Sequence, residues 1–202
     1  MKNTANQPSH DLSASSNLTH PLMPVSLEEY KDALRNLALK NDPFIFDNKG
    51  ADHAAAVMSL FFEYCTEVRI YANDMNGDIS NKQDYQQALK NFLEKDNSSL
   101  KIMFDGEPSE GSQSVQYLKN FSDGRKVQFK TATDTFRSAM KEIAIDRTTL
   151  YHFAVGDERM VRLESDNKNH IAPFCSFNHP VSAEMLIKLF DHHFTESPDH
   201  AL

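Results

Sequence analysis

Residues able to bind a ligand follow the first strand-like run of the sequence. Residues 67–71 alternate between apolar and polar types, and the turn-rich segment 73–80 begins with Asn73 and Asp74. In an open α/β sheet, ligands bind in the crevice outside the carboxyl ends of the strands. The sequence therefore predicts that Asn73 and Asp74 contribute to a binding site.

The sequence contains partial metal-binding patterns, but none of them is complete. Residues 74–78 begin like an EF-hand loop, but Ile79 and Tyr85 stand where that loop needs a Gly and a bidentate Glu. The adjacent pair His192-His193 is separated by about 100° around a helix, so we expect the two rings to point to different sides. His152 and His170 have no local ligand partner. We predict no metal site and no cofactor.

The segment Leu-Tyr-His-Phe-Ala-Val-Gly-Asp at residues 150–157 carries the clearest motif. Its Phe-Ala-Val-x-Asp part resembles the H-x-K-x-x-x-x-D motif of the phospholipase D superfamily. In this register Leu150 takes the His position, His152 takes the Lys position, and Asp157 is retained. The segment 175–178 is similar to the small-Ser-x-x-Asn stretch of that family, which adds Ser176 and Asn178.

The departures from this motif decide what the resemblance implies. In the family the His acts as nucleophile or acid, the Lys binds phosphate and the Asp supports them. Leu150 can neither form a covalent phospho-intermediate nor hold a phosphate oxygen. The resemblance implies a phospholipase-D-like domain without catalysis, in which His152 points into a cleft beside Ser176 or Asn178. The ligand-binding candidates are then His152, Asp157, Ser176, Asn178, Asn73 and Asp74. An unrelated hairpin with a Gly-Asp turn at 156–157 explains the same residues.

The elements that must position these residues alternate along the chain. Two helices come first, then three strand–helix repeats, a three-strand meander and a final helix that begins at Pro180. Strands that alternate with helices favour a parallel sheet, to which the meander adds antiparallel strands. We predict an α/β fold: a mixed, mostly parallel sheet with helices on both faces. Residues 1–24 are expected to be a disordered tail and residues 25–202 a single domain.

Composition narrows the class of function. The chain has 202 residues and a net charge of −8, with 21 Lys and Arg against 29 Asp and Glu. This balance disfavours a protein that coats DNA or anionic membranes. No segment has the apolar length of a membrane span or the core of a signal peptide, so we expect a cytoplasmic protein. Cys65 and Cys175 lie in apolar runs and are expected to be buried.

Three functions remain open. The first is a noncatalytic binding or regulatory module, an accessory component of a bacterial multi-protein system. It would contact a protein partner or form a homodimer through residues 149–155 and 170–177. The second is a phosphodiesterase or nuclease with a non-standard site built from Asn73, Asp74, His152, Asp157 and Ser176. The third is a nucleic-acid binder that uses the basic residues Lys119, Arg125, Lys126, Lys130, Arg137 and Lys141.

Overall fold

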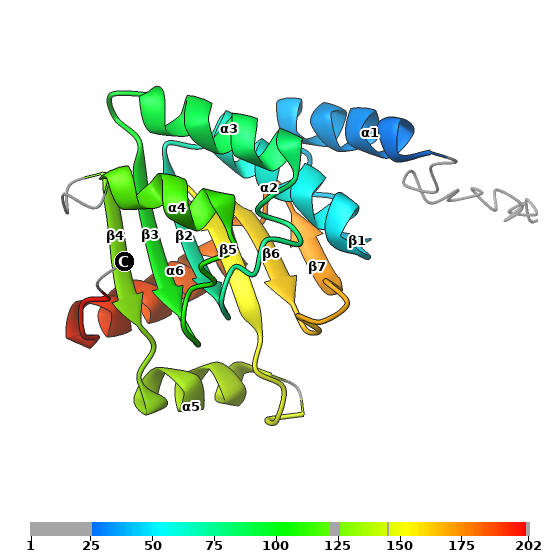
Figure 1. Ribbon diagram of the computed structural model, residues 1–202. Coiled ribbons are helices and arrows are strands. Elements are labelled where there is room, and N and C mark those ends of the chain that lie inside the picture. The colour runs from blue at the N-terminus through cyan, green and yellow to red at the C-terminus, as the bar shows by residue number, and fades with distance from the viewer. Residues whose placement is uncertain (1–25, 122–125, 145, 201–202) are drawn as a thin grey trace, which may run out of the picture.

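Seven strands and six α-helices make up the part of the chain that the computed structural model describes, residues 26–121, 126–144 and 146–200 (Figure 1). The predicted tail, residues 1–24, lies outside the described residues. The helices are α1 (Leu27–Leu39), α2 (Ala51–Tyr64), α3 (Gln83–Glu94), α4 (Gln113–Leu118), α5 (Asp134–Ile143) and α6 (Pro180–Glu196), with a 3₁₀ turn at Lys119–Phe121. The strands are β1 (Phe46–Asn48), β2 (Glu67–Ala72), β3 (Ser99–Phe104), β4 (Val127–Thr131), β5 (His152–Gly156), β6 (Met160–Glu164) and β7 (Ala172–Ser176).

Local capping chemistry fixes where several helices begin. The Ser26 hydroxyl accepts a hydrogen bond from the backbone N–H of Glu29 at 3.3 Å, and Thr133 caps α5 in the same way through Phe136. Pro180 is the first residue of α6. The N–H groups of the first helical turn have no helical acceptor, so the missing N–H of proline costs no hydrogen bond there. The predicted start of the last helix at Pro180 is therefore confirmed.

The strands form one sheet in the order β1-β7-β6-β5-β2-β3-β4. Only the pairs β2–β3 and β3–β4 are parallel, whereas β1–β7, β7–β6, β6–β5 and β5–β2 are antiparallel. The α/β class and the mixed sheet are confirmed, but the prediction of a mostly parallel sheet is wrong. Short turns join β5, β6 and β7, and such turns can connect only antiparallel neighbours.

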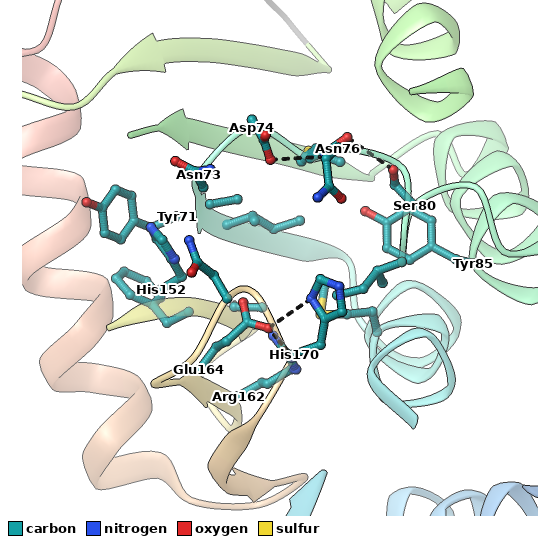
Figure 2. A pocket seen from close by; sticks show the side chains of 18 of the residues that line it. Tyr71, Asn73, Asp74, Asn76, Ser80, Tyr85, His152, Arg162, Glu164 and His170 are labelled. Carbon is teal, nitrogen blue, oxygen red and sulfur yellow. Dashed lines mark hydrogen bonds and ion pairs between the residues drawn. The ribbon is translucent and has the colours of Figure 1, made fainter. Parts of the chain in front are cut away.

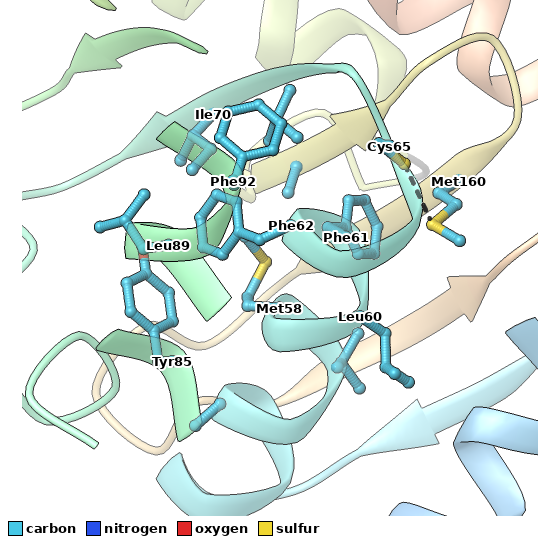
Figure 3. Packing of buried hydrophobic residues seen from close by; sticks show 14 of the residues in the cluster. Met58, Leu60, Phe61, Phe62, Cys65, Ile70, Tyr85, Leu89, Phe92 and Met160 are labelled. Atoms are coloured by element: carbon cyan, nitrogen blue, oxygen red, sulfur yellow. Dashed lines mark hydrogen bonds between the residues drawn. The ribbon is translucent and has the colours of Figure 1, made fainter. Parts of the chain in front are cut away.

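Helices cover both faces of this sheet (Figure 1). Helices α1 to α4 lie over one face, and α6 lies over the other together with α5. The first face holds the larger apolar cluster, in which α2 supplies Met58, Leu60, Phe61 and Phe62 (Figure 3). On the other face, Phe153 of β5 packs edge-on against Phe190 of α6.

Helix α2 approaches β5 closely at Gly156. A Cβ built on this glycine would lie 2.5 Å from the Sγ atom of Cys65 and 3.0 Å from the Phe61 ring. Cys65 is buried and contacts the sulfur of Met160 at 3.4 Å (Figure 3). Cys175 is buried as well, and burial raises the pKa of its thiol to about 12. Both cysteines are therefore buried core residues, as predicted.

The two strands expected to form a dimer seam are internal to the sheet. β5 pairs with β2 and β6, and β7 pairs with β6 and β1. Neither strand therefore offers a free edge to a second chain, and the predicted seam at residues 149–155 and 170–177 is wrong. Along the described part of the chain, no helix is long and apolar enough to cross a membrane.

Candidate functional site

A pocket of about 230 Å³ opens at the carboxyl end of β2, on the sheet face that α2 and α3 cover (Figure 2). Two loops border it: residues 73–82, between β2 and α3, and residues 165–171, between β6 and β7. Met58 of α2 and Ala154 of β5 supply apolar surface, and polar side chains supply the remainder. The loop after β2 therefore borders the site, as the strand-end argument predicts.

A buried ion pair on β6 forms one wall of the pocket. Arg162 and Glu164 lie two residues apart and so face the same side of the strand. The Arg162 Nη2 atom donates to Glu164 Oε1 at 2.9 Å, and its Nε atom donates to Asn48 Oδ1 at 2.9 Å. Burial alone would raise the pKa of Glu164, but Arg162 and His170 outweigh it and lower this pKa to about 2. The pocket therefore contains a carboxylate that stays ionised.

His170 links the two loops across this pocket (Figure 2). Its Nδ1 atom lies 3.7 Å from Glu164 Oε1, and its Nε2 atom lies 3.3 Å from Asp78 Oδ2. The backbone at His170 has a φ of +53°, and its carbonyl accepts a hydrogen bond from Asn48 Nδ2. Glu164 contributes most to raising the pKa of His170, and Asp78 adds to this effect. The His170 ring thus joins the 73–82 loop to the sheet.

His152 begins β5 at the rim of the pocket, opposite Glu164 in the β5–β6 ladder. Its ring meets Tyr71 edge-on, with 4.9 Å between the centroids. Its Nε2 atom is buried without a hydrogen-bond partner and lies 3.9 Å from Asp105 Oδ2. The other oxygen of Asp105 accepts a hydrogen bond from the Tyr71 hydroxyl at 2.9 Å and pairs with Arg137. His152 therefore separates the pocket from a second polar cluster at the ends of β2 and β3.

Asn73 and Asp74 both line the pocket, but they are held differently. The Asp74 carboxylate accepts a hydrogen bond from the backbone N–H of Asn76 at 3.1 Å, and so shapes the loop. The Asn73 side chain packs on Gly106, where an added Cβ would lie 3.1 Å from its Oδ1 atom. Glycine at 106 leaves room for this amide. Ligand binding by the two residues stays a prediction.

Three other sequence candidates lie at the opposite end of the strands. Asp157 Oδ1 accepts hydrogen bonds from the backbone N–H groups of Thr66 and Glu67, both at 2.9 Å, and so closes the turn after β5. Ser176 pairs with Val161, three residues along β6 from the partner of His152. That register separates Ser176 from His152 by about 10 Å along the strands and about 10 Å across them.

Asn178 lies next to Ser176 and is therefore also far from His152. Its backbone N–H donates to the Ser176 hydroxyl at 3.3 Å, and its side chain donates to the carbonyl of Asn41 at 2.7 Å. The expectation that His152 lies beside Ser176 or Asn178 is therefore wrong. The motif lies along β5, with His152 at one end and Asp157 just beyond the other. These two residues therefore have different surroundings.

The described cations of the predicted basic stretch are distributed from the 3₁₀ turn to α5. Lys126 donates to the carbonyls of Leu93 and Lys95, at the end of α3. Lys130 pairs with Asp199 at 2.8 Å, and Arg137 pairs with Asp105 and Asp134. Lys119 lies in the 3₁₀ turn, Lys141 lies in the last turn of α5, and Arg125 is outside the described residues. Most of these cations therefore have intramolecular partners.

The histidine pair on α6 differs only in part from expectation. The donor atoms of His192, His193 and Glu196 all lie within 4.8 Å of one another. The two side chains leave the helix on different sides, as predicted, since His192 is exposed and His193 is buried, but their donor atoms still lie close together. This group lies on α6, which covers the opposite sheet face from the pocket.

Sequence reasoning missed the residues that give the pocket its charge: Arg162, Glu164 and His170. The signal lay in the segment 159–164, where a strongly apolar strand carries Arg and Glu two residues apart. Charged residues are rarely buried unless they are paired, so such a pattern in an internal strand marks a buried ion pair.

Comparisons with known proteins give no family. No protein family model matches the chain, and no curated protein matches it. Among solved structures, the archaeal chromatin protein TrmBL2 has a TM-score of 0.48 at 12% identity, covering 86% of this chain and 61% of that one. A phosphatidylserine synthase from Haemophilus influenzae has a TM-score of 0.49 at 12% identity, covering 78% and 39%. The chain thus spans less than two thirds of the length of each of these proteins.

Proposed function

We propose that this chain is a noncatalytic, phospholipase-D-like binding module whose ligand occupies the pocket between the 73–82 and 165–171 loops. One observation carries the proposal: the buried Arg162–Glu164 pair faces a pocket that also holds polar groups without protein partners. Ligand pockets are typically concave and partly apolar, with a few polar groups that fix orientation. The phospholipase-D-like part rests on the sequence resemblance at residues 153–157.

Three pocket groups are available to a ligand. Within residues 26–121, 126–144 and 146–200, the side-chain amide of Asn73 and the hydroxyl of Tyr85 make no hydrogen bond. Glu164 uses its Oε1 atom for both Arg162 and His170, which leaves Oε2 free among the same residues. Together they offer an amide, a hydroxyl and a carboxylate oxygen. A buried polar group gains most from a partner that completes its hydrogen bonds.

The charges of the pocket favour a ligand without strong negative charge. Glu164 and Asp74 face Arg162 and Lys168, and the His170 ring already contacts Glu164 and Asp78. Arg162 donates from Nε to Asn48 and from Nη2 to Glu164, so its charge is already paired with a carboxylate. Phosphate sites need several convergent cations or backbone N–H groups. We therefore propose a small, hydrogen-bonding ligand that is not a phosphodiester.

The arrangement of possible nucleophiles supports binding over catalysis. The non-standard site that would combine His152, Asp157 and Ser176 is split between two ends of the sheet. The pocket's own serine, Ser80, shares hydrogen bonds with the Ser112 hydroxyl and the Met75 carbonyl rather than with a base. Nucleophilic catalysis requires a nucleophile and a base within hydrogen-bonding reach. The regulatory role and the protein partner stay predictions of the sequence.

The test is to titrate the full chain with small probes and to monitor binding through NMR chemical shifts. The probes are glucose, glycerol and adenosine, with inorganic phosphate as the anionic comparison. We expect an uncharged probe to shift resonances of Ala154 and Ile79, and Asn73→Ala or Tyr85→Phe to weaken its binding at least tenfold. Because the Tyr85 hydroxyl has no protein partner, Tyr85→Phe should leave the fold intact. Tyr117→Phe, outside the pocket, is the matched control.

Two results would contradict the proposal. The first is saturable binding of phosphate alone that Asn73→Ala and Tyr85→Phe leave unchanged. The second is hydrolysis of bis(4-nitrophenyl) phosphate that disappears in His152→Ala. Binding to mixed DNA that weakens steeply with salt would instead favour the nucleic-acid alternative.

A further inference from the structure

The last turn of α6 gathers three groups that commonly bind transition metals. His192, His193 and Glu196 each place one donor atom within 4.8 Å of the others, and the two imidazole centroids are 4.9 Å apart. His192 and Glu196 are exposed, whereas His193 is buried. This is a cluster of two nitrogen donors and one carboxylate, outside the pocket described above.

Helical spacing explains why the three donors meet. Glu196 lies four residues after His192 and three after His193, and both spacings bring side chains together on a helix surface. The carboxylate is thus the common neighbour of two rings that start about 100° apart around the axis. A single helix therefore supplies all three donors.

One ligand of this set is already fixed in place. His193 is 7% exposed, and its ring packs on Phe136 of α5 with 5.4 Å between centroids. The ring of His193 is therefore held in place by its packing before any ion binds.

The remaining two ligands have the freedom to close around an ion. Tetrahedral zinc, with bonds of about 2.0–2.2 Å, holds its ligand atoms about 3.4 Å apart. The exposed side chains of His192 and Glu196 can make this adjustment by rotating. The cluster also lies at the carboxyl end of α6, where the helix dipole favours a cation.

We propose that His192, His193 and Glu196 form a binding site for a divalent transition metal of the zinc class. Two imidazoles and one carboxylate are a ligand set that zinc accepts, and three protein ligands leave a fourth position for water or another donor. The bound ion would join the last turn of α6 to the α5 contact made by His193. This site is independent of the pocket and of the function proposed for it.

The experiment is calorimetric titration of the untagged full chain with Zn²⁺, paired with visible absorption after Co²⁺ addition. The background is the variant His10→Ala/His20→Ala, which removes two histidines elsewhere in the chain. We expect one ion per chain and the intense visible bands of four-coordinate Co²⁺. His192→Ala and Glu196→Gln should each weaken Zn²⁺ binding at least tenfold while the melting temperature without metal stays unchanged. His200→Ala should bind as the background does.

Glu196→Asp provides a further check, because it keeps the carboxylate but shortens its reach. We expect binding between that of the background protein and Glu196→Gln. Equal Zn²⁺ affinity in the background, His192→Ala and Glu196→Gln proteins would overturn the proposal. So would a Co²⁺ spectrum that stays octahedral and weak at saturation.

Discussion

The Asp105 carboxylate approaches the buried ring of His152, with 3.9 Å between Oδ2 and Nε2. That distance is too long for a hydrogen bond, so Nε2 has no hydrogen-bond partner among the described residues. The nearby His152 contributes most to lowering the pKa of Asp105; burial opposes this effect, and Arg137 and Tyr71 add to it. The cluster thus stabilises an ionised carboxylate at the ends of β2 and β3, outside the pocket lining.

Asp105→Asn should destabilise the protein more at neutral pH than in acid. The folded pKa of Asp105 lies below its unfolded value, so its stabilisation is present above about pH 4 and is lost as the pH falls. The carboxylate is only 18% exposed and holds the buried Tyr71 hydroxyl. We expect a loss of about 1–3 kcal/mol in the free energy of unfolding at pH 7. Urea titrations at pH 7 and pH 3 measure it.

Asp134→Asn is the matched control, because Asp134 also pairs with Arg137 but is fully exposed. Its effect should be small at both pH values. Equal losses in the two variants, or a loss for Asp105→Asn that is as large at pH 3 as at pH 7, would show that the buried cluster does not depend on ionised Asp105.

Asp157→Ala should lower stability without changing the pocket. The substitution removes the acceptor for two backbone N–H groups, those of Thr66 and Glu67. The φ of +47° at this position adds strain for alanine, whereas asparagine tolerates it. We expect a loss of about 2 kcal/mol for alanine and a smaller loss for asparagine, by urea unfolding. Weaker ligand binding in a folded Asp157→Asn protein would contradict the placement of Asp157 away from the site.

Stability should also fall as the pH rises above about 6.5 because of His170. Its folded pKa is raised, so its contribution is complete below the unfolded value of about 6.5 and is lost as the pH rises through the folded value. His170→Gln should remove this part of the pH dependence. An NMR titration of the ring measures the pKa directly, and a value below 6.5 would contradict the contacts with Glu164 and Asp78.

The sequence predicted the helices and strands better than it predicted which strands pair with each other. Apolar periodicity identified α2, α3 and α6 to within a few residues, because local burial patterns determine helix faces. Strand order depends on contacts between distant segments: Phe46 pairs with Cys175, and Val68 pairs with Gly156. Asn73 could be placed at a strand end from sequence. The contact of His170 with Asp78 joins residues 92 positions apart and leaves no local pattern.

The Arg162–Glu164 pair provides the final prediction, a double-mutant cycle. Removing one partner of a buried ion pair leaves an unpaired charge, so Arg162→Met should cost about 3–5 kcal/mol. Glu164→Gln should cost less, because the neutral amide still accepts a hydrogen bond from Arg162. The double variant Arg162→Met/Glu164→Gln should cost less than the sum, since neither charge then remains buried.

Unfolding in urea at pH 7 gives all three free energies, and the coupling should be at least about 1 kcal/mol. Arg159→Met is the control, because Arg159 donates to backbone carbonyls of Phe177 and Tyr64 outside the pocket. The losses in the free energy of unfolding caused by Arg159→Met and Glu164→Gln should be additive in the variant that combines them. Additive losses for Arg162→Met and Glu164→Gln would mean that the two charges act independently, and that the pocket wall does not depend on their pairing.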